Sequence, residues 1–197
     1  MTSLLETAVR NAQLLRLPLR VAVFYSRARR LAARSEDEWS LASATKPESL
    51  AELLRMARGR RRVVEIGTGT AWTTVALALA DPARRVVSFD PVVRPERERY
   101  LALAPASVIS RIELAAEAGE RGPAARDEIV DMVFIDGSHE RERTIATFEV
   151  WRAAIAPGGA VVFHDFDNPA YPGVGEAISD MALDGEVVRD MFVHFCP

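Results

Sequence analysis

Short apolar runs alternate with amphipathic stretches from residue 61 to the end of the chain. Compact runs rich in valine and isoleucine predict strands over 61–67, 84–90, 110–116, 130–136, 158–167 and 189–195. Apolar positions at helical spacing predict helices over 70–81, 94–104, 141–156 and 173–183. This alternation predicts an α/β fold, with a mainly parallel sheet of about seven strands and helices on both faces.

The N-terminal part of the chain has only helical patterns. A first helix is expected from Leu4 to near Pro18, and a second over 19–34. A loop then leads into a third helix near residue 47. We therefore divide one globular unit into N-terminal helices with a substrate-side lid, residues 1–58, and a cofactor-binding core, residues 59–197.

Composition and charge narrow the class of function. A chain of 197 residues, 49% of them hydrophobic, can bury the core of one domain. A net charge of -3 provides no basic field for nucleic acid, and no apolar run approaches the roughly 18 residues of a membrane span. The single cysteine, Cys196, excludes an internal disulfide framework. We expect a cytoplasmic protein that acts on a small molecule, with neither nucleic acid nor membrane as partner. A homodimer is left open.

The first predicted strand leads into a glycine-rich loop, Glu65-Ile66-Gly67-Thr68-Gly69. Glycines at these places let the backbone approach a ligand closely, and ligands of such sheets lie beyond the carboxyl ends of the strands. A dinucleotide fingerprint would require glycine or alanine where this chain has Trp72. A nucleotide-dependent oxidoreductase is therefore the weaker interpretation.

An acid, Asp90, ends the second predicted strand. With this acid and the glycine-rich loop, the chain resembles the class I S-adenosylmethionine-dependent methyltransferases from about residue 45 to the C-terminus. The resemblance implies a Rossmann-like, doubly wound fold with extra N-terminal helices and S-adenosylmethionine as cofactor. In that family the acid binds both ribose hydroxyls, which a carboxylate can do bidentately. The alternative for Asp90 is a residue of an Asp-Pro turn.

Other cofactor contacts follow from the resemblance. The family recognises adenine near Ala118 and Gly119, where Glu117 or Glu120 could accept from the exocyclic amine, although many members carry Gly-Asp-Ala here. Glu65 has an alternative role as a structural acceptor beneath the loop. The residues expected at the cofactor are Glu65, Gly67, Thr68, Gly69, Thr73, Asp90, Ala118, Gly119 and Asp136.

The fourth and fifth predicted strands end in FIDGSH and VVFHDFD, and in this sheet order they are neighbours. The chain is most similar here to small-molecule O-methyltransferases of the catechol type and of natural-product tailoring. Catechol-type enzymes hold a divalent cation with an acid after strand four and an Asp-Asn pair after strand five, but Phe166 replaces the asparagine. The resemblance implies a metal site at Asp136, His164 and Asp165. Imidazole would favour manganese, iron or zinc over magnesium.

The sequence leaves two details of this proposed site open. Strand alternation would place His164 and Asp165 on opposite faces, leaving Asp165 as the ligand. His139 follows Asp136 by three residues, where catechol-type enzymes carry the lysine that takes the substrate proton. A histidine, with a pKa of about 6.5, can do this at neutral pH. We therefore expect His139 and Asp136 to be catalytic. In the alternative, Asp136 or Ser138 only caps the following helix.

The predicted function is methyl transfer from S-adenosylmethionine to a hydroxyl, or alternatively an amine, of a small molecule. His139 would deprotonate the acceptor, with a divalent metal at Asp136 and Asp165 as an additional element. Trp39, Trp72 and Tyr171 are candidates for the walls of the substrate pocket. The competing interpretation is a protein with this cofactor fold that catalyses other chemistry or only binds the cofactor.

Overall fold

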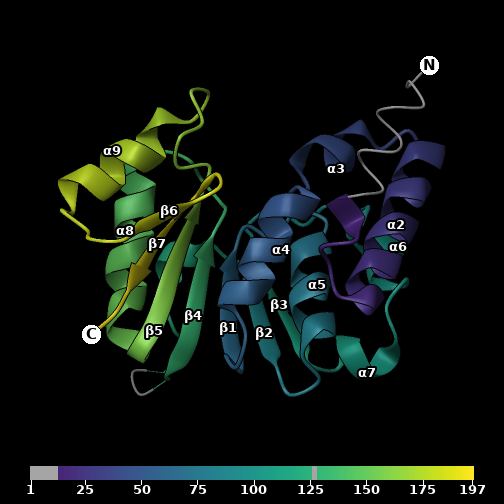
Figure 1. Ribbon diagram of the computed structural model, residues 1–197, viewed down its shortest axis with the longest axis horizontal. Helices are drawn as coiled ribbons and strands as arrows, with labels where there is room; N and C mark the ends of the chain where they lie inside the picture. The colour runs from purple at the N-terminus through teal and green to yellow at the C-terminus, as the bar shows by residue number, and fades with distance from the viewer. Residues whose placement is uncertain (1–12, 126–127) are drawn as a thin grey trace.

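A computed structural model describes residues 13–125 and 128–197 of the chain (Figure 1). Its centre is a seven-stranded sheet in the order β3-β2-β1-β4-β5-β7-β6. The strands are β1 (Arg62–Ile66), β2 (Arg85–Phe89), β3 (Ile112–Ala115), β4 (Val130–Ile135), β5 (Ile155–His164), β6 (Glu186–Val188) and β7 (Met191–Phe195). All pairings are parallel except those of β7, which is antiparallel to β5 and β6. The predicted mainly parallel, Rossmann-like sheet is confirmed.

Helices cover both faces of the sheet, as Figure 1 shows. They are α2 (Leu19–Arg34), α3 (Glu38–Ser43), α4 (Pro47–Met56), α5 (Trp72–Ala80), α6 (Arg97–Leu101), α7 (Ala106–Ile109), α8 (Arg141–Trp151) and α9 (Pro172–Asp180). Successive strand residues face opposite sides, so Val63 joins the core under α2, α4 and α5, and Val64 the core under α8 and α9. Among the described helices, none is long and apolar enough to cross a membrane.

The N-terminal helices share the core of the sheet domain. Phe24 of α2 is buried in the same cluster as Trp72 of α5. The Tyr25 ring meets the Trp72 ring edge-on, with 5.4 Å between the ring centroids, and the Tyr25 hydroxyl donates to the carbonyl of Thr45 at 2.9 Å. Helix α2 is therefore packed as part of one unit. The first predicted helix, from Leu4, lies mostly outside the described residues.

The strand register brings four strand ends to one level. Ile66 of β1 lies between Phe89 of β2 and Ile135 of β4, and Ile135 in turn pairs with Phe163 of β5. The residues that follow these four are Gly67, Asp90, Asp136 and His164. Because parallel strands end at the same edge of a sheet, these residues lie side by side at the edge where ligands bind.

Several element boundaries differ from the sequence predictions. Helix α3 lies where a loop was expected, because Asp37 caps it by accepting the backbone N–H of Ser40 at 3.0 Å. The helix predicted over 141–156 ends at Trp151, and Ile155 already pairs with the fourth strand. The register then shifts before residue 160, so β5 begins earlier than predicted and residues 157–159 form an irregularity inside it. The elements α7 and β6 were not predicted because they are too short to show a period.

A buried arginine stabilises the edge of the sheet opposite these strand ends. Arg84 is 1% exposed, and its guanidinium donates to three backbone carbonyls, those of Arg60 at 2.9 Å, of Leu77 at 2.8 Å, and of Ala57. The last two carbonyls belong to the C-terminal turns of α5 and α4, which have no helical partners for them.

Replacing Arg84 with methionine removes a donor from each of these carbonyls, and the Ala57 carbonyl then keeps only the N–H of Arg60, at 3.1 Å. We expect Arg84→Met to lower the free energy of unfolding by about 2–3 kcal/mol, measured by urea denaturation. The neighbouring exposed Arg85 provides the control, since Arg85→Met removes an equal charge from the surface. Equal losses in the two variants would contradict a specific role for the Arg84 contacts.

Candidate active site

A cavity of about 590 Å³ lies over the carboxyl edge of the sheet. The glycine loop and the ends of β2, β4 and β5 line it, together with α3, the residues that join it to α4, and residues 168 and 171. The three aromatic residues proposed as pocket walls, Trp39, Trp72 and Tyr171, all line it. The N-terminal part of the chain thus forms part of the cavity wall.

The glycine loop passes close to the end of β4. Gly67 has φ +103°, and a Cβ atom there would lie 2.0 Å from the carbonyl oxygen of Asp136. The loop is fixed on both sides, because Gly67 N–H donates to the Phe89 carbonyl at 2.8 Å and Asp136 N–H donates to the Ile66 carbonyl at 2.8 Å. A side chain at position 67 would displace Asp136, so this position requires glycine.

Glu65 lies beneath the loop and does not line the cavity. Its carboxyl group accepts hydroxyl hydrogen bonds from Ser88, at 2.6 Å, and from Thr74. The Thr68 hydroxyl extends this network through Ser88, 2.7 Å away. Burial raises the pKa of Glu65 to about 8, against these hydrogen bonds, which favour the carboxylate. Glu65 is thus linked to the loop through the hydroxyl groups of Ser88 and Thr68.

Asp90 lines the cavity at the end of β2. Its Oδ2 atom accepts the N–H of Gly69 at 2.8 Å, and its Oδ1 atom accepts the N–H of Val92 at 2.8 Å. Each carboxylate oxygen can accept a second hydrogen bond, so Asp90 retains acceptor capacity toward a ligand in the cavity.

The α3 segment is fastened to the glycine loop by side chains. The Ser40 hydroxyl donates to Thr70 at 3.0 Å, and the hydroxyls of Thr45 and Thr73 are 2.9 Å apart. Trp39 also covers the loop, because a Cβ atom at position 69 would lie 3.0 Å from its ring, and the guanidinium of Arg94 lies 3.3 Å above that ring. This segment is a fixed wall in the structure.

Ala118 and Gly119 line the part of the cavity beyond β3. The carbonyl of Gly119 is held by the indole N–H of Trp151 at 2.9 Å. The two carboxylates proposed as adenine acceptors are both paired with arginines, Glu117 with Arg121 and Glu120 with Arg143. These ion pairs reduce the capacity of both glutamates to accept from an adenine amine.

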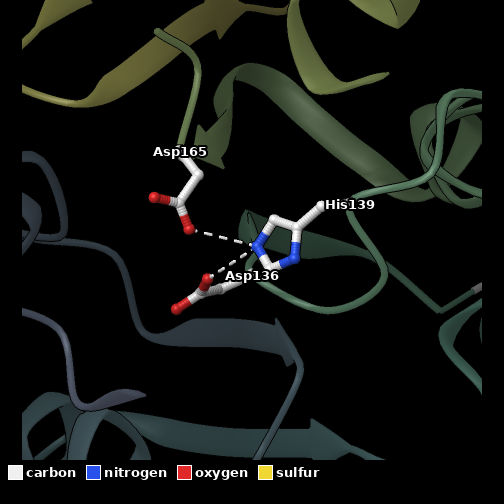
Figure 2. A group of neighbouring side chains, drawn as sticks. All are labelled: Asp136, His139 and Asp165. Atoms are coloured by element: carbon white, nitrogen blue, oxygen red, sulfur yellow. Dashed lines mark ion pairs between the residues drawn. The ribbon is translucent and has the colours of Figure 1, made fainter. Parts of the chain in front are cut away.

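Asp136, His139 and Asp165 converge at the opposite end of the cavity (Figure 2). The Nε2 atom of His139 lies 3.1 Å from Oδ2 of Asp165 and 3.7 Å from Oδ1 of Asp136. One ligand atom from each residue lies within 4.8 Å of the others. Nε2 is buried yet its N–H is not aligned with either carboxylate, so it makes no hydrogen bond. Such a group of donors can hold a metal ion.

His164, predicted as a metal ligand, is not part of this converging trio. Its Nδ1 atom lies 3.0 Å from Oδ1 of Asp136 and 3.2 Å from Oδ2 of Asp165, and its Nε2 atom lies 3.5 Å from Asp190. Strand alternation does not continue through Asp165, whose φ of +57° turns the chain, so His164 and Asp165 both line the cavity; Asp165 belongs to the trio, as expected. His139 takes the place expected of His164.

Asp190 was missed from the sequence. It precedes β7, which returns antiparallel to β5, and so reaches the site only through the tertiary fold. No motif marks it. Ser138 is also not a helix cap, since α8 begins at Arg141 and the Ser138 hydroxyl accepts only the N–H of Glu140, at 3.4 Å.

The charges of the cluster stabilise one another. Burial disfavours a charged His139, but Asp136 and Asp165 outweigh this effect and raise its pKa to about 9. Burial also disfavours a charged His164. The charge of Asp136 and hydrogen bonds to Asp136, Asp165 and Asp190 outweigh this effect and raise its pKa to about 12. The two imidazoles in turn hold the pKa of Asp165 far below its usual range, against its burial. At neutral pH both histidines are therefore protonated, and His139 must lose this proton before it can act as a base.

Residues between β5 and α9 hold two members of the cluster. The Tyr171 ring stacks on the imidazole of His139, with 4.0 Å between centroids and 18° between planes. The amide of Asn168 donates to Oδ1 of Asp165 at 2.8 Å. The loop thus orients one face of the site and presents Tyr171 to the cavity.

The sequence matches a known family over these same elements. A family model described as a methyltransferase domain matches residues 64–166. The chain belongs to this methyltransferase family. The match spans β1 to the residues just after β5, and includes the glycine loop, Asp90 and the Asp136, His139 and Asp165 cluster. Membership of this S-adenosylmethionine-dependent family decides against the oxidoreductase interpretation.

Solved structures share the fold of this methyltransferase. An O-methyltransferase from Bacillus cereus in complex with SAH has a TM-score of 0.69 at 17% identity, covering 89% of this chain and 91% of that one. CalS11, a TDP-rhamnose 3'-O-methyltransferase of calicheamicin biosynthesis, has a TM-score of 0.61 at 18% identity, covering 99% and 96%.

A third structure carries a different acceptor in its name. The precorrin-6y C5,15-methyltransferase from Geobacter metallireducens has a TM-score of 0.60 at 16% identity, covering 79% of this chain and 91% of that one. At these identities the similarity establishes the fold and leaves the acceptor open. Among curated proteins, no sequence matches the chain significantly.

Glu65 makes the stability of this methyltransferase depend on pH. Its pKa is about 8 in the folded protein against 4.5 for the free side chain, so the folded state binds the extra proton between these values. The contribution of the protonated Glu65 carboxyl group to the free energy of unfolding is fully present below pH 4.5. It is lost as the pH rises through 8. The neutral variant Glu65→Gln should lack this loss.

We expect the difference in unfolding free energy between Glu65→Gln and the parent protein to grow with pH across this window, by at most about 1.4 kcal/mol per pH unit. Urea denaturation at several pH values measures it. Glu113→Gln is the control, because Glu113 of β3 is exposed. Parallel pH profiles for Glu65→Gln and the parent protein would contradict a neutral Glu65.

Proposed function

We propose that this methyltransferase transfers the methyl group of S-adenosylmethionine to a hydroxyl group of a small molecule. The observation that supports this most is the composition of one cavity, which has the glycine loop and Asp90 at one end and Asp136, His139 and Asp165 at the other. Two of the similar structures are named as O-methyltransferases. An amine acceptor is the variant of the same proposal.

The cofactor would lie along the carboxyl edge of the sheet. Asp90 would accept hydrogen bonds from both ribose hydroxyls, and Ala118 and Gly119 would border the adenine. The methionine part would lie against the loop around Gly67 and Thr68, which brings the sulfonium toward Asp136. Because methyl transfer is an in-line displacement, the protein needs mainly to orient the two reactants and to provide a deprotonated acceptor.

A divalent metal fits the cluster of Asp136, His139 and Asp165. The support is that three ligand atoms converge within 4.8 Å and that the buried Nε2 atom of His139 lacks a hydrogen-bond partner. One imidazole with two carboxylates favours manganese, iron or zinc over magnesium. When bound, such a cation would lower the pKa of an acceptor hydroxyl. In this arrangement His164 holds Asp136 through its 3.0 Å contact and orients it.

His139 cannot be a metal ligand and a proton acceptor through the same Nε2 atom. The ligand role explains why this atom lies between two carboxylates without a hydrogen bond. We therefore favour His139 as a ligand. The base role predicted from the sequence is the alternative. Both roles require the imidazole to lose its Nε2 proton first.

Removal of the Asp90 carboxylate tests the cofactor site. We expect Asp90→Ala to weaken S-adenosylmethionine binding by about 10- to 100-fold in isothermal titration calorimetry, because two charge-assisted hydrogen bonds are lost. Asp184→Asn is the control, since the Asp184 side chain is fully exposed. Tight NAD binding, or equal cofactor affinity in Asp90→Ala and the parent protein, would refute the assignment.

Direct metal titration tests the cluster independently of turnover. After chelator treatment and dialysis, Mn²⁺ should bind more tightly than Mg²⁺ in calorimetry, and His139→Ala or Asp165→Asn should weaken Mn²⁺ binding at least about tenfold. His194→Ala is a matched control, because His194 does not line the cavity. Equal Mn²⁺ binding in all three variants would exclude the site. Methylation that survives chelation but not His139→Ala would instead assign His139 as the base.

A further inference from the structure

A second buried arginine lies behind the cofactor end of the cavity. Arg97 of α6 is 4% exposed and does not line the cavity. Its Nε atom donates to the carbonyl of Gly69 at 3.0 Å, and its Nη2 atom donates to the carbonyl of Val92 at 3.1 Å. Nη2 also lies 3.7 Å from Oδ2 of Asp90. Burial of a guanidinium is costly unless specific partners compensate, and here the partners all belong to the cofactor end.

The contacts of Arg97 and Asp90 form a closed network. Gly69 and Val92 each donate their N–H to Asp90, and each offers its carbonyl to Arg97. The Asp90 carboxylate therefore binds the backbone N–H groups of the glycine loop and of the turn after β2, and the Arg97 guanidinium binds their carbonyls. The loop itself offers little regular hydrogen bonding, because Gly67, Gly69 and Ala71 all have positive φ. Other backbone bonds also hold the loop, and within it Arg97 is the donor to the carbonyl of Gly69.

We propose that Arg97 is a positioning residue for cofactor binding. It acts through Asp90, by fixing the two peptide segments that aim the carboxylate into the cavity, and it does not touch the cofactor. This inference rests on the proposed role of Asp90 at the ribose. Arg97 is 7 positions beyond the acid and follows no glycine or strand-end motif, so the sequence pattern does not mark it.

Removing the guanidinium should weaken cofactor binding and leave the chemical step intact. Arg97→Met keeps the apolar stem but removes all donors, and we expect its affinity for S-adenosylmethionine to fall about tenfold or more in calorimetry. Arg97→Lys retains the charge and one donor nitrogen, and its affinity should lie between those of Arg97→Met and the parent protein. Once an acceptor is identified, Arg97→Met should have a higher KM for the cofactor than the parent protein. Its kcat at saturating cofactor and its KM for the acceptor should be unchanged.

Arg84→Met is the control that distinguishes a role of Arg97 in cofactor positioning from a general effect on protein stability. Arg84 is an equally buried arginine that also donates to backbone carbonyls, but it lies at the opposite edge of the sheet. Both methionine variants should lose stability, and only Arg97→Met should lose cofactor affinity. If Arg97→Met does not fold, the stability and cofactor affinity of Arg97→Lys are compared with those of Arg84→Lys instead.

A double-mutant cycle tests whether Arg97 acts through Asp90. In the background of Asp90→Asn, the change Arg97→Met should cost much less affinity than in the parent protein. Parent-like affinity in folded Arg97→Met or Arg97→Lys, an equal loss in the Arg84 variant, or fully additive losses in the cycle would each overturn the inference. Failure of the parent protein itself to bind S-adenosylmethionine would instead refute the proposed function, and this inference with it.

Discussion

The close approach of the glycine loop to the end of β4 is the contact on which the whole site depends. At Gly67 there is no room for a side chain, because the carbonyl of Asp136 occupies the space a Cβ atom would need. This contact joins the half of the cavity that fits a cofactor to the half that carries the acid and histidine cluster. The strand register fixes the same relation, since Ile66 and Ile135 are direct neighbours. A methyl donor and an acceptor would thereby meet at one backbone junction.

Three acids near this junction are held in three different electrostatic settings. Glu65 is buried with hydroxyl partners only, and it keeps its proton up to about pH 8. Asp90 is held by two backbone amides with Arg97 behind them. Asp165 lies against two imidazoles that keep it ionised. The partners of each acid thus decide whether the acid is protonated beneath the loop, faces the cavity or is ionised beside the imidazoles.

The sequence was informative where function follows directly from local pattern. Asp90, Asp136 and Asp165 could be located because each comes just after a short apolar run, and such runs end at the ligand edge of the sheet. That His139, and not His164, completes the converging trio with Asp136 and Asp165 could not be predicted, since it depends on how the chain folds at the strand end. Arg97 gave no local sign either, because its role depends on contacts across the fold.

The hydroxyl contacts of residues 40 and 45 with the glycine loop and α5 bear on how the cavity wall can be exchanged between such proteins. Ser40 and Thr45 bind Thr70 and Thr73, so the wall of the cavity and the cofactor loop are mechanically joined. A chimera that exchanges residues 1–46 with those of a relative would leave Thr70 and Thr73 without their partners. A chimera that keeps these contacts therefore has to include the glycine loop and the start of α5 as well, so a change at Ser40 or Thr45 constrains Thr70 or Thr73.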